Sequence, residues 1–265
     1  MEDMLIKILV CVKSSAPADA PLVINDSGAW IERGFSHTEA VPGRYDELAL
    51  EQALRLKDQI SGVMVDAISC GPTREIRVLR RALGMGCDNA IHILTGEEGF
   101  VPAITTAYRL SSAIRSRSYD LILTGLMSED MNQGIVGQMT AEFLGMPCLT
   151  SCVSISVDAE RRLVMVERDI EGARRQKLEM NMPALATVQA CVTPPRYPSL
   201  SKILRAVSME IETIEADPVT VHDRGEILTR LTYPTRRRSV RFLEGPSRQK
   251  ASELVSILRS RAILG

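Results

Sequence analysis

The sequence predicts an α/β protein built on a doubly wound, mostly parallel sheet, and three observations support this fold class. Residues 5–12 (LIKILVCV) are apolar at nearly every position, as in a central strand covered on both faces. Strand-like runs then alternate with helical patterns, which favours parallel strands joined by right-handed crossovers. Residues 119–144 form a strand, a polar loop and a helix, the arrangement that places ligand-binding loops at the carboxyl edge of such a sheet.

The remaining elements up to residue 144 follow from hydrophobic periodicity. After Lys13, a long polar stretch contains a possible short hairpin around residues 25–28. Asp46 is the expected cap of the amphipathic helix that follows. Strands are then expected over 63–69, 90–94 and 120–124, and helices over 73–84, over 101–117 and from Gly134 onwards.

The pattern changes beyond Pro147. Residues 152–157, 162–170 and 174–180 alternate like an antiparallel meander, and 182–188 return to the main sheet. A proline-rich loop (193–198), a helix near 201–206, a charged linker to about residue 230 and an amphipathic helix over 247–261 complete the chain. We therefore expect an α/β domain over 1–206 and a C-terminal arm over 207–265. The sequence leaves open whether the last helix packs on its own domain or on another chain.

Composition limits the possible functions. The 265 residues carry a formal net charge of −1, which gives no global reason to expect a nucleic-acid or membrane partner. No apolar segment approaches the ~20 residues of a membrane span, and residues 1–12 lack the features of a signal peptide, so the cytoplasm is the expected location. The six cysteines show no close-paired metal motif and are expected to be reduced, so no metal site is predicted.

The loop after the predicted strand 120–124 is the main candidate site. A helix that opens after a small-residue loop leaves its first amides unpaired, and an anion can bind there. Gly134 and Gly137 would let a phosphate approach the backbone, while Ser128, Asp130, Asn132 and Gln133 offer polar groups to a ribose or to the helix cap. An ordinary capped loop explains the same residues equally well, since no Walker or GxGxxG spacing is present.

Four loops should converge at this edge and form a cleft for an adenine nucleotide. They follow Val12, surround Tyr45–Asp46, span residues 69–72 and span residues 125–137. Cys11 and Cys70 have no base near them in the sequence, so buried thiols are expected rather than nucleophiles. Glu129 and Asp130 would repel a phosphate and are expected to face solvent or a ribose. No general acid or base stands out.

Several segments carry a resemblance to a known family. They are KILVCVK (7–13), YDELALEQALRLKD (45–58), SCGPTREIRVLRRALGMGCDNAIHI (69–93), GLMSEDMNQGIVGQMTAEFLGMP (125–147), VERDIEGARRQKLEMNMPALATV (166–188) and PPRYPSLSKILRA (194–206). The chain resembles the β subunit of electron transfer flavoproteins from about residue 4 to its C-terminus. The segment 166–188 is similar to the family's signature, and 194–206 is similar to its partner-recognition loop.

The resemblance implies a Rossmann-like, adenine-nucleotide-binding subunit without chemistry of its own. It would bind structural AMP, pair with an α subunit that carries FAD, and exchange electrons with acyl-CoA or other dehydrogenases. In bifurcating relatives a second FAD occupies the same cleft. The implied cofactor-binding residues are Cys11, Gly43, Arg44, Tyr45, Asp46, Cys70, Gly125, Leu126, Met127, Ser128, Glu129, Asp130, Met131, Asn132, Gln133, Gly134, Ile135 and Val136, and the implied docking residues are Tyr197 and Leu200.

Departures from the family pattern bear on the nucleotide. Gly43-Arg44 replaces the usual Asn-Pro, so contacts to the adenosine part are expected to differ. Val101–Ile104 replaces the Asp-Thr pair of bifurcating members, which favours AMP. The tail over 228–264 is more similar to bifurcating and anaerobic types, which favours FAD. A free-standing nucleotide-binding or nucleotide-hydrolysing protein is the alternative class. It would need a glycine-rich phosphate loop after the first strand, where residues 12–17 have no glycine.

Overall fold

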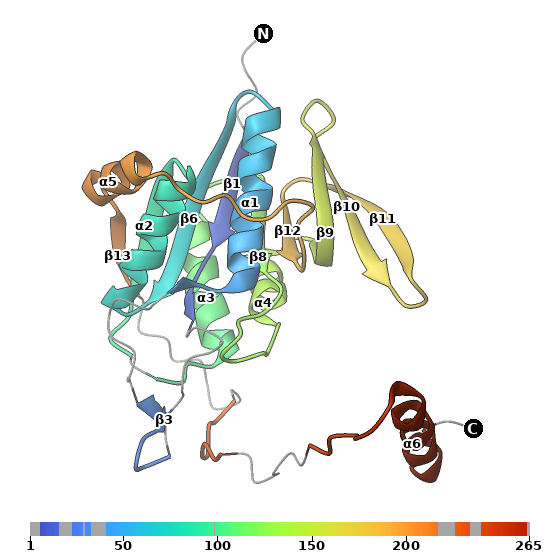
Figure 1. Ribbon diagram of the computed structural model, residues 1–265. Coiled ribbons are helices and arrows are strands. Elements are labelled where there is room, and N and C mark those ends of the chain that lie inside the picture. Colours follow the sequence, from blue (N-terminus) through green and yellow to red (C-terminus); the bar gives the residue numbers. More distant parts are fainter. Residues whose placement is uncertain are drawn as a thin grey trace. The chain divides into compact units, whose positions relative to one another are not determined.

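The structure is a computed structural model that describes residues 6–15, 23–28, 30–32, 41–97, 99–216, 226–233 and 240–263. The chain divides into two compact units, Met1–Leu231 and Thr232–Gly265. The first unit is an α/β domain with helices on both faces of one large sheet (Figure 1). The described residues include no helix with the length and apolar character needed to cross a membrane.

The main sheet has nine strands in the order β11-β10-β9-β12-β8-β1-β6-β7-β13. Its members are β1 (Ile6–Cys11), β6 (Val63–Gly71), β7 (Asn89–Leu94), β8 (Leu121–Gly125), β9 (Cys148–Asp158), β10 (Leu163–Ile170), β11 (Arg174–Asn181), β12 (Ala184–Val188) and β13 (Glu212–Glu215). All pairings are parallel except β9–β10 and β10–β11, which form the expected antiparallel excursion. The predicted doubly wound α/β fold is confirmed.

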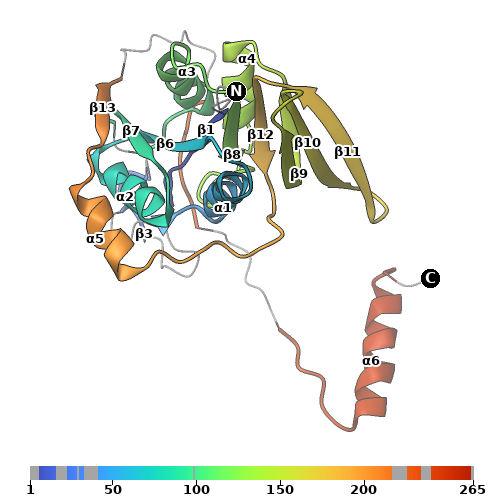
Figure 2. The ribbon, with the colours of Figure 1, turned by 90° about the horizontal axis from the view of Figure 1, so that it is seen from above.

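Helices cover both faces of the parallel part of the sheet (Figure 2). One layer holds α1 (Arg44–Gln59) and α2 (Ile76–Met85), which is preceded by the 3-10 turn Thr73–Glu75. The other layer holds α3 (Ala103–Ile114) and α4 (Val136–Leu144). The helices occur where hydrophobic periodicity predicted them, although α4 begins two residues later than expected.

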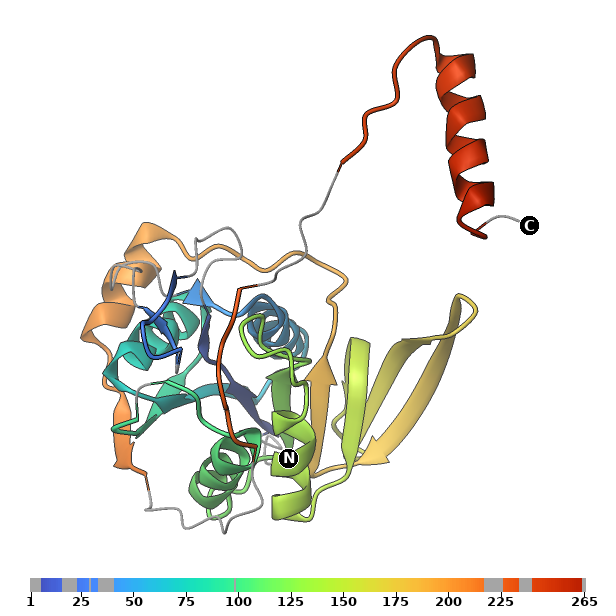
Figure 3. The same ribbon diagram turned by 90° about the horizontal axis from the view of Figure 1, so that it is seen from below.

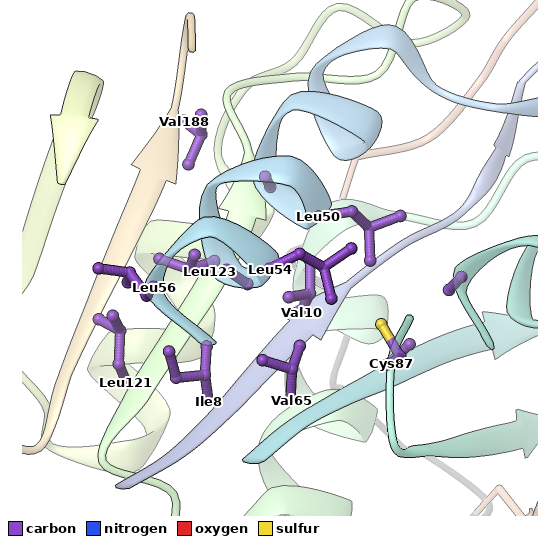
Figure 4. Close-up of a cluster of buried hydrophobic side chains, with 14 of the residues drawn as sticks. Ile8, Val10, Leu50, Leu54, Leu56, Val65, Cys87, Leu121, Leu123 and Val188 are labelled. Carbon is purple, nitrogen blue, oxygen red and sulfur yellow. The ribbon is translucent and has the colours of Figure 1, made fainter. Parts of the chain in front are cut away.

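Alternate side chains of each strand supply two separate cores. Ile8 and Val10 of β1 pack with Leu50 and Leu54 of α1 on one face (Figure 4), whereas Leu9 faces the layer of α3 and α4 on the other. Because both faces of a parallel strand are buried, the strand is apolar at consecutive positions, which explains the unbroken run over residues 5–12.

Strand β1 lies between β6 and β8, so the chain proceeds from β1 in one direction to β7 and then returns to the opposite side of β1. This reversal is the topological switch point of the sheet, where connections diverge and leave a crevice beyond the carboxyl ends of the strands. Figure 3 views the domain from that edge.

Short elements lie around this edge. The hairpin predicted around residues 25–28 is confirmed as β3 (Val23–Ile24) paired with β4 (Ile31–Glu32). Strand β2 (Ser14–Ser15) pairs with β5 (Val41–Pro42) and ties the loop after β1 to the entry of α1. Met1–Leu5 and most of residues 16–40 lie outside the described residues.

The prediction of a charged linker that runs to about residue 230 is partly wrong, because parts of this segment belong to the domain. Strand β13 pairs with β7 at the sheet edge, following α5 (Leu200–Ser208). Residues 226–231 also contact other parts of the domain. Glu226 accepts a hydrogen bond from the Gln133 side chain, and the Leu231 amide donates to the Gly28 carbonyl at 2.8 Å. The second unit contains α6 (Ser247–Ser260), the predicted final helix. The division at residue 206 stays a prediction.

Candidate functional site

The four loops predicted to converge do form one cleft at the carboxyl ends of β1, β6 and β8. Its cavity volume is about 210 Å³, and the cleft is partly open to solvent. Val12, Asp46, Cys70 and the segment 124–137 without residues 129 and 132 contribute to its lining. The cleft therefore lies at the switch point of the sheet.

Asp46 holds two of these loops together. The prediction that it caps α1 is wrong: the helix begins at Arg44 after Gly43, and Asp46 lies in its first turn. Its carboxylate instead accepts hydrogen bonds from the amides of Lys13, at 2.9 Å, and Gly125. Burial raises the pKa of Asp46 to about 7, and the nearby Glu75 adds to this, while the two amides and the charge of Lys13 act in the opposite direction.

Gly125 is required by this arrangement. A Cβ atom at this position would lie 2.3 Å from Oδ1 of Asp46 and 2.9 Å from its amide nitrogen. No side chain fits there without moving the start of α1 away from the end of β8. The glycine at the end of β8 thus permits the close approach of α1 to this strand.

Glu75 is a second carboxylate that binds the loop after β1. Only 3% of the residue is exposed, and its carboxylate accepts hydrogen bonds from the Ser14 amide at 2.6 Å, from the Ser14 hydroxyl and from Ser69 Oγ at 3.3 Å. The amides of Lys13 and Ser14 are thus both bound to carboxylates of the protein. They are not available to a ligand.

The loop after β8 differs from the loop after β1, because it leads to backbone amides that have no partner. Met139 N bonds to Ile135 O at 3.0 Å, so the amides of Val136, Gly137 and Gln138 precede the first bond of α4. In the described part of the chain no side chain caps this helix. Gly134, with a φ of 63°, turns the chain into it, a conformation that favours glycine. The start of α4 therefore presents unpaired backbone donors next to the cleft.

Gly137 has a packing role that the sequence did not show. A Cβ there would lie 2.6 Å from Thr124 Oγ1 and 2.9 Å from Thr187 Cγ2, so α4 sits directly on β8 and β12. A side chain at Gly137 would disturb helix packing before it reached any ligand. Replacing Gly137 is consequently a poor test of phosphate approach.

Two ion pairs lie at the cleft. Lys13 Nζ binds Asp130 at 2.6 Å and joins the loop after β1 to the loop after β8. Burial alone would raise the pKa of Asp130, but the charge of Lys13 and hydrogen bonds from Lys13 and Ser128 lower it below its usual value. On the opposite wall, Arg109 of α3 forms a bidentate pair with Glu97. These pairs neutralise the charges of Lys13 and Arg109, and Arg74, which also lines the cleft, lies 3.6 Å from Glu75.

The cysteines of the cleft are poor nucleophiles. Burial raises the pKa of Cys70 to about 12, with a smaller opposing effect from Arg109. Burial also raises the pKa of Cys11, and Asp46 reinforces the shift. Both thiols stay protonated at neutral pH, so nucleophilic attack by them is unfavourable.

The predicted cofactor-binding positions fall into two groups. Those that line the cleft are Cys11, Asp46, Cys70, Gly125, Leu126, Met127, Ser128, Asp130, Met131, Gln133, Gly134, Ile135 and Val136. Those that do not are Gly43, Arg44, Tyr45, Glu129 and Asn132. Some of the second group brace the loops: Gly43 N bonds to Lys13 O at 3.1 Å, and Arg44 N bonds to Glu129 at 3.3 Å. Nucleotide binding by either group stays a prediction.

The predicted docking residues lie on α5 and the loop before it. Tyr197 is 82% exposed and Leu200 is 72% exposed. Leu200 is therefore not part of the core of its domain. Arg196 fixes the loop to α1 through Glu51, with bonds of 2.9 and 3.0 Å, and through Asp58 at 2.8 Å.

Sequence reasoning missed Glu75, Glu97 and Arg109 in the cleft. Helical spacing could have indicated Arg109, because it follows Thr106 by three residues and so lies on the same face of the helix. No local pattern marks Glu75 as an inward-facing carboxylate. Its role depends on Ser14, which is 61 residues away in the chain.

These features define a class: an α/β protein with a preformed ligand cleft at its switch point and an uncapped helix start beside it. A model of the electron transfer flavoprotein domain family matches residues 36–219. The chain is 33% identical over 229 residues to the electron transfer flavoprotein subunit beta of Bacillus subtilis (strain 168), covering 82% of this chain and 85% of that protein. It is 30% identical over 257 residues to the mitochondrial electron transfer flavoprotein subunit beta of Arabidopsis thaliana, covering 97% and 98%.

The chain therefore belongs to the electron transfer flavoprotein β subunit family, and its role is in electron transfer. A third relative, from Methylophilus methylotrophus, is 26% identical over 260 residues, with 95% of this chain and 97% of that protein covered. The resemblance of the sequence motifs to this family is confirmed.

Proposed function

We propose that this chain is the structural subunit of a heterodimeric electron transfer flavoprotein and binds AMP in the cleft. A partner α subunit would hold the FAD that accepts electrons from acyl-CoA or other dehydrogenases. The β chain would contribute the scaffold, the nucleotide and a docking surface, without chemistry of its own. The cytoplasm stays the predicted location, although one relative is named as mitochondrial.

The uncapped start of α4 is the observation that carries this proposal. It supplies a run of three unpaired amides, those of Val136, Gly137 and Gln138, beside the cleft and next to the tight turn at Gly134. The competing site, the loop after β1, has the Lys13 and Ser14 amides already bound by Asp46 and Glu75. A nucleotide-hydrolysing protein would need the amides of that loop to bind phosphates. Because these amides are already paired, the loop argues against a free-standing nucleotide-hydrolysing protein.

The composition of the cleft wall favours AMP over a second flavin. Val101 and Ala103 line the cleft without polar side chains that could bind a flavin's second phosphate or ribityl chain. Lys13 and Arg109 are both paired with carboxylates. One anion site beside a helix start suits a nucleoside monophosphate.

Identification of the extracted nucleotide tests the proposal. The chain is co-purified with its α subunit, the complex is denatured with acid, and the released nucleotides are separated by chromatography. We expect one FAD and one AMP per heterodimer, and no visible flavin spectrum in the isolated chain. Two FAD per heterodimer, or stoichiometric flavin absorbance in the folded β chain alone, would show that the cleft holds a flavin.

The docking role is tested at Leu200. Because the side chain is 72% exposed, Leu200→Ala should leave the unfolding free energy and nucleotide content almost unchanged. Loss of an anchor worth about 2 kcal/mol should slow electron transfer from the partner dehydrogenase by over ~tenfold. Val23→Ala, another exposed aliphatic residue of the same domain, is the matched control. Equal rates for the two variants would remove Leu200 from the docking surface.

A further inference from the structure

The Glu97–Arg109 pair has hydrogen-bonding capacity that the protein itself does not use. Arg109 is 8% exposed, and its Nη2 donates to Glu97 Oε1 at 2.8 Å while Nη1 donates to Oε2. Within the described residues, Nε of Arg109 has no hydrogen-bond partner. Buried polar groups are nearly always satisfied, so an unmet donor in the wall of a cleft points to a ligand.

The two side chains present a donor and an acceptor side by side. A guanidinium that meets a carboxylate end-on uses one N–H of each terminal nitrogen. The outer N–H of each terminal nitrogen remains available to another acceptor. Each carboxylate oxygen likewise keeps a second acceptor position. Glu97 is 49% exposed in its side chain, so this flank is accessible from the cleft. The pair is neutral in net charge, which suits an uncharged polar group better than a second phosphate.

The location of the pair matches the far end of a nucleotide whose phosphate lies at α4. The charges of Arg109 and Glu97 both act on Cys70, which lies near the carboxyl end of β6, so the pair lies close to the end of that strand. Strands β8, β1 and β6 are neighbours, and a spacing of about 4.8 Å puts β6 roughly 10 Å from β8. A nucleoside monophosphate can span this separation. The indole of Trp30 also lies in this wall, against Gly99.

We propose that Glu97 and Arg109 recognise the base of the bound nucleotide and select adenine over hypoxanthine. Adenine donates from its 6-amino group and accepts at N1, which matches Glu97 as acceptor and Arg109 as donor. Hypoxanthine reverses both roles, so its 6-carbonyl would face the Glu97 carboxylate while the phosphate end stays anchored. This proposal rests on the proposed nucleotide function and adds the residues that determine its base specificity.

Competition between AMP and IMP tests the proposal. The full-length chain, in the complex in which it purifies, is equilibrated with equal concentrations of both nucleotides and freed of unbound nucleotide by gel filtration. Acid extraction and chromatography then give the bound AMP:IMP ratio. We expect the unaltered protein to retain AMP over IMP by about tenfold or more, because the wrong base leaves polar groups facing like partners.

Glu97→Gln should reduce this ratio to below about threefold, since an amide can turn to present either a donor or an acceptor. Glu212→Gln is the matched control. Glu212 meets the fork of Arg117 in the same end-on manner but does not line the cleft, and its loss should leave the ratio unchanged.

Two results would overturn the base assignment while leaving AMP binding intact. One is equal retention of AMP and IMP by the unaltered protein. The other is an unchanged AMP:IMP ratio in folded Glu97→Gln, or in Arg109→Gln if Glu97→Gln retains too little nucleotide to measure. Failure of the unaltered protein to retain either nucleotide would instead refute the proposed AMP site, and the base assignment with it.

Discussion

Two loops leave the same edge of the sheet from neighbouring strands, yet they present opposite surfaces to the cleft. After β1, the amides of Lys13 and Ser14 are bound by the carboxylates of Asp46 and Glu75. After β8, the first amides of α4 have neither helical partners nor a side-chain cap in the described part of the chain. The difference shows that a loop's position in a doubly wound fold does not make it an anion site. Its amides must also be left unpaired.

The contact between the two loops depends most strongly on Gly125. Gly125→Ala should lower the unfolding free energy by about 3 kcal/mol, because the new Cβ would displace Asp46 and its hydrogen bonds to the loop after β1. Chemical denaturation measures this loss. Gly96→Ala is the control, since a Cβ there meets no atom within 4 Å and the change should be nearly neutral. A neutral Gly125→Ala would mean that the two loops do not depend on each other.

The pH dependence of stability tests the state of Asp46. Its pKa rises from 3.8 to about 7 on folding, so the folded chain binds more protons than the unfolded chain between these values. The contribution of Asp46 to the unfolding free energy is therefore greatest at low pH. It falls as the pH approaches 7, by at most about 1.4 kcal/mol per pH unit.

Comparison with Asp46→Asn isolates this group from the other carboxyls. The substitution should cost more stability at pH 5 than at pH 8, as measured by denaturation at both pH values. The opposite order would mean that the amides of Lys13 and Gly125 outweigh burial and keep Asp46 ionised.

A negative charge in the loop after β8 should weaken nucleotide binding. Ser128 lines the cleft in this loop, and Ser128→Glu would place a carboxylate near the proposed phosphate position. We expect AMP to bind about tenfold more weakly, which corresponds to a loss of ~1.4 kcal/mol of binding free energy. Ser128→Gln has nearly the same size without the charge and serves as control. Calorimetric titration showing equal AMP affinity for both variants would place the phosphate elsewhere.

The smallest effect is expected from the ion pair that joins the two loops. Lys13 and Asp130 are both partly exposed, so Lys13→Met should lower the unfolding free energy by less than about 1 kcal/mol. It would also free the Asp130 carboxylate beside the phosphate site and weaken AMP binding by roughly threefold. Adding Asp130→Asn should restore the affinity, and a double-mutant cycle measures the coupling. No restoration would show that Asp130 does not act on the nucleotide.

Sequence pattern was sufficient for the elements whose surroundings are uniform. Strand β1 is apolar throughout because both faces are buried, and the helices show the period of a single buried face. The strand–loop–helix at residues 119–144 and the convergence of four loops followed from the topology of parallel sheets. Family motifs added the identity of the chain, which no periodicity contains.

Only the tertiary structure decided what individual polar groups do. Asp46 has the sequence context of a helix cap, but the nearest unpaired amides belong to Lys13 and Gly125, far away along the chain. Gly137 has the context of a phosphate loop, yet Thr124 and Thr187 occupy the space that its side chain would need. Glu75 acquires its role from Ser14, and Arg109 acquires its role from Glu97. Sequence determines which face of an element is buried, because that depends on local periodicity. Which atoms meet across the cleft depends on the packing of elements distant in the chain, and that the sequence by itself did not reveal.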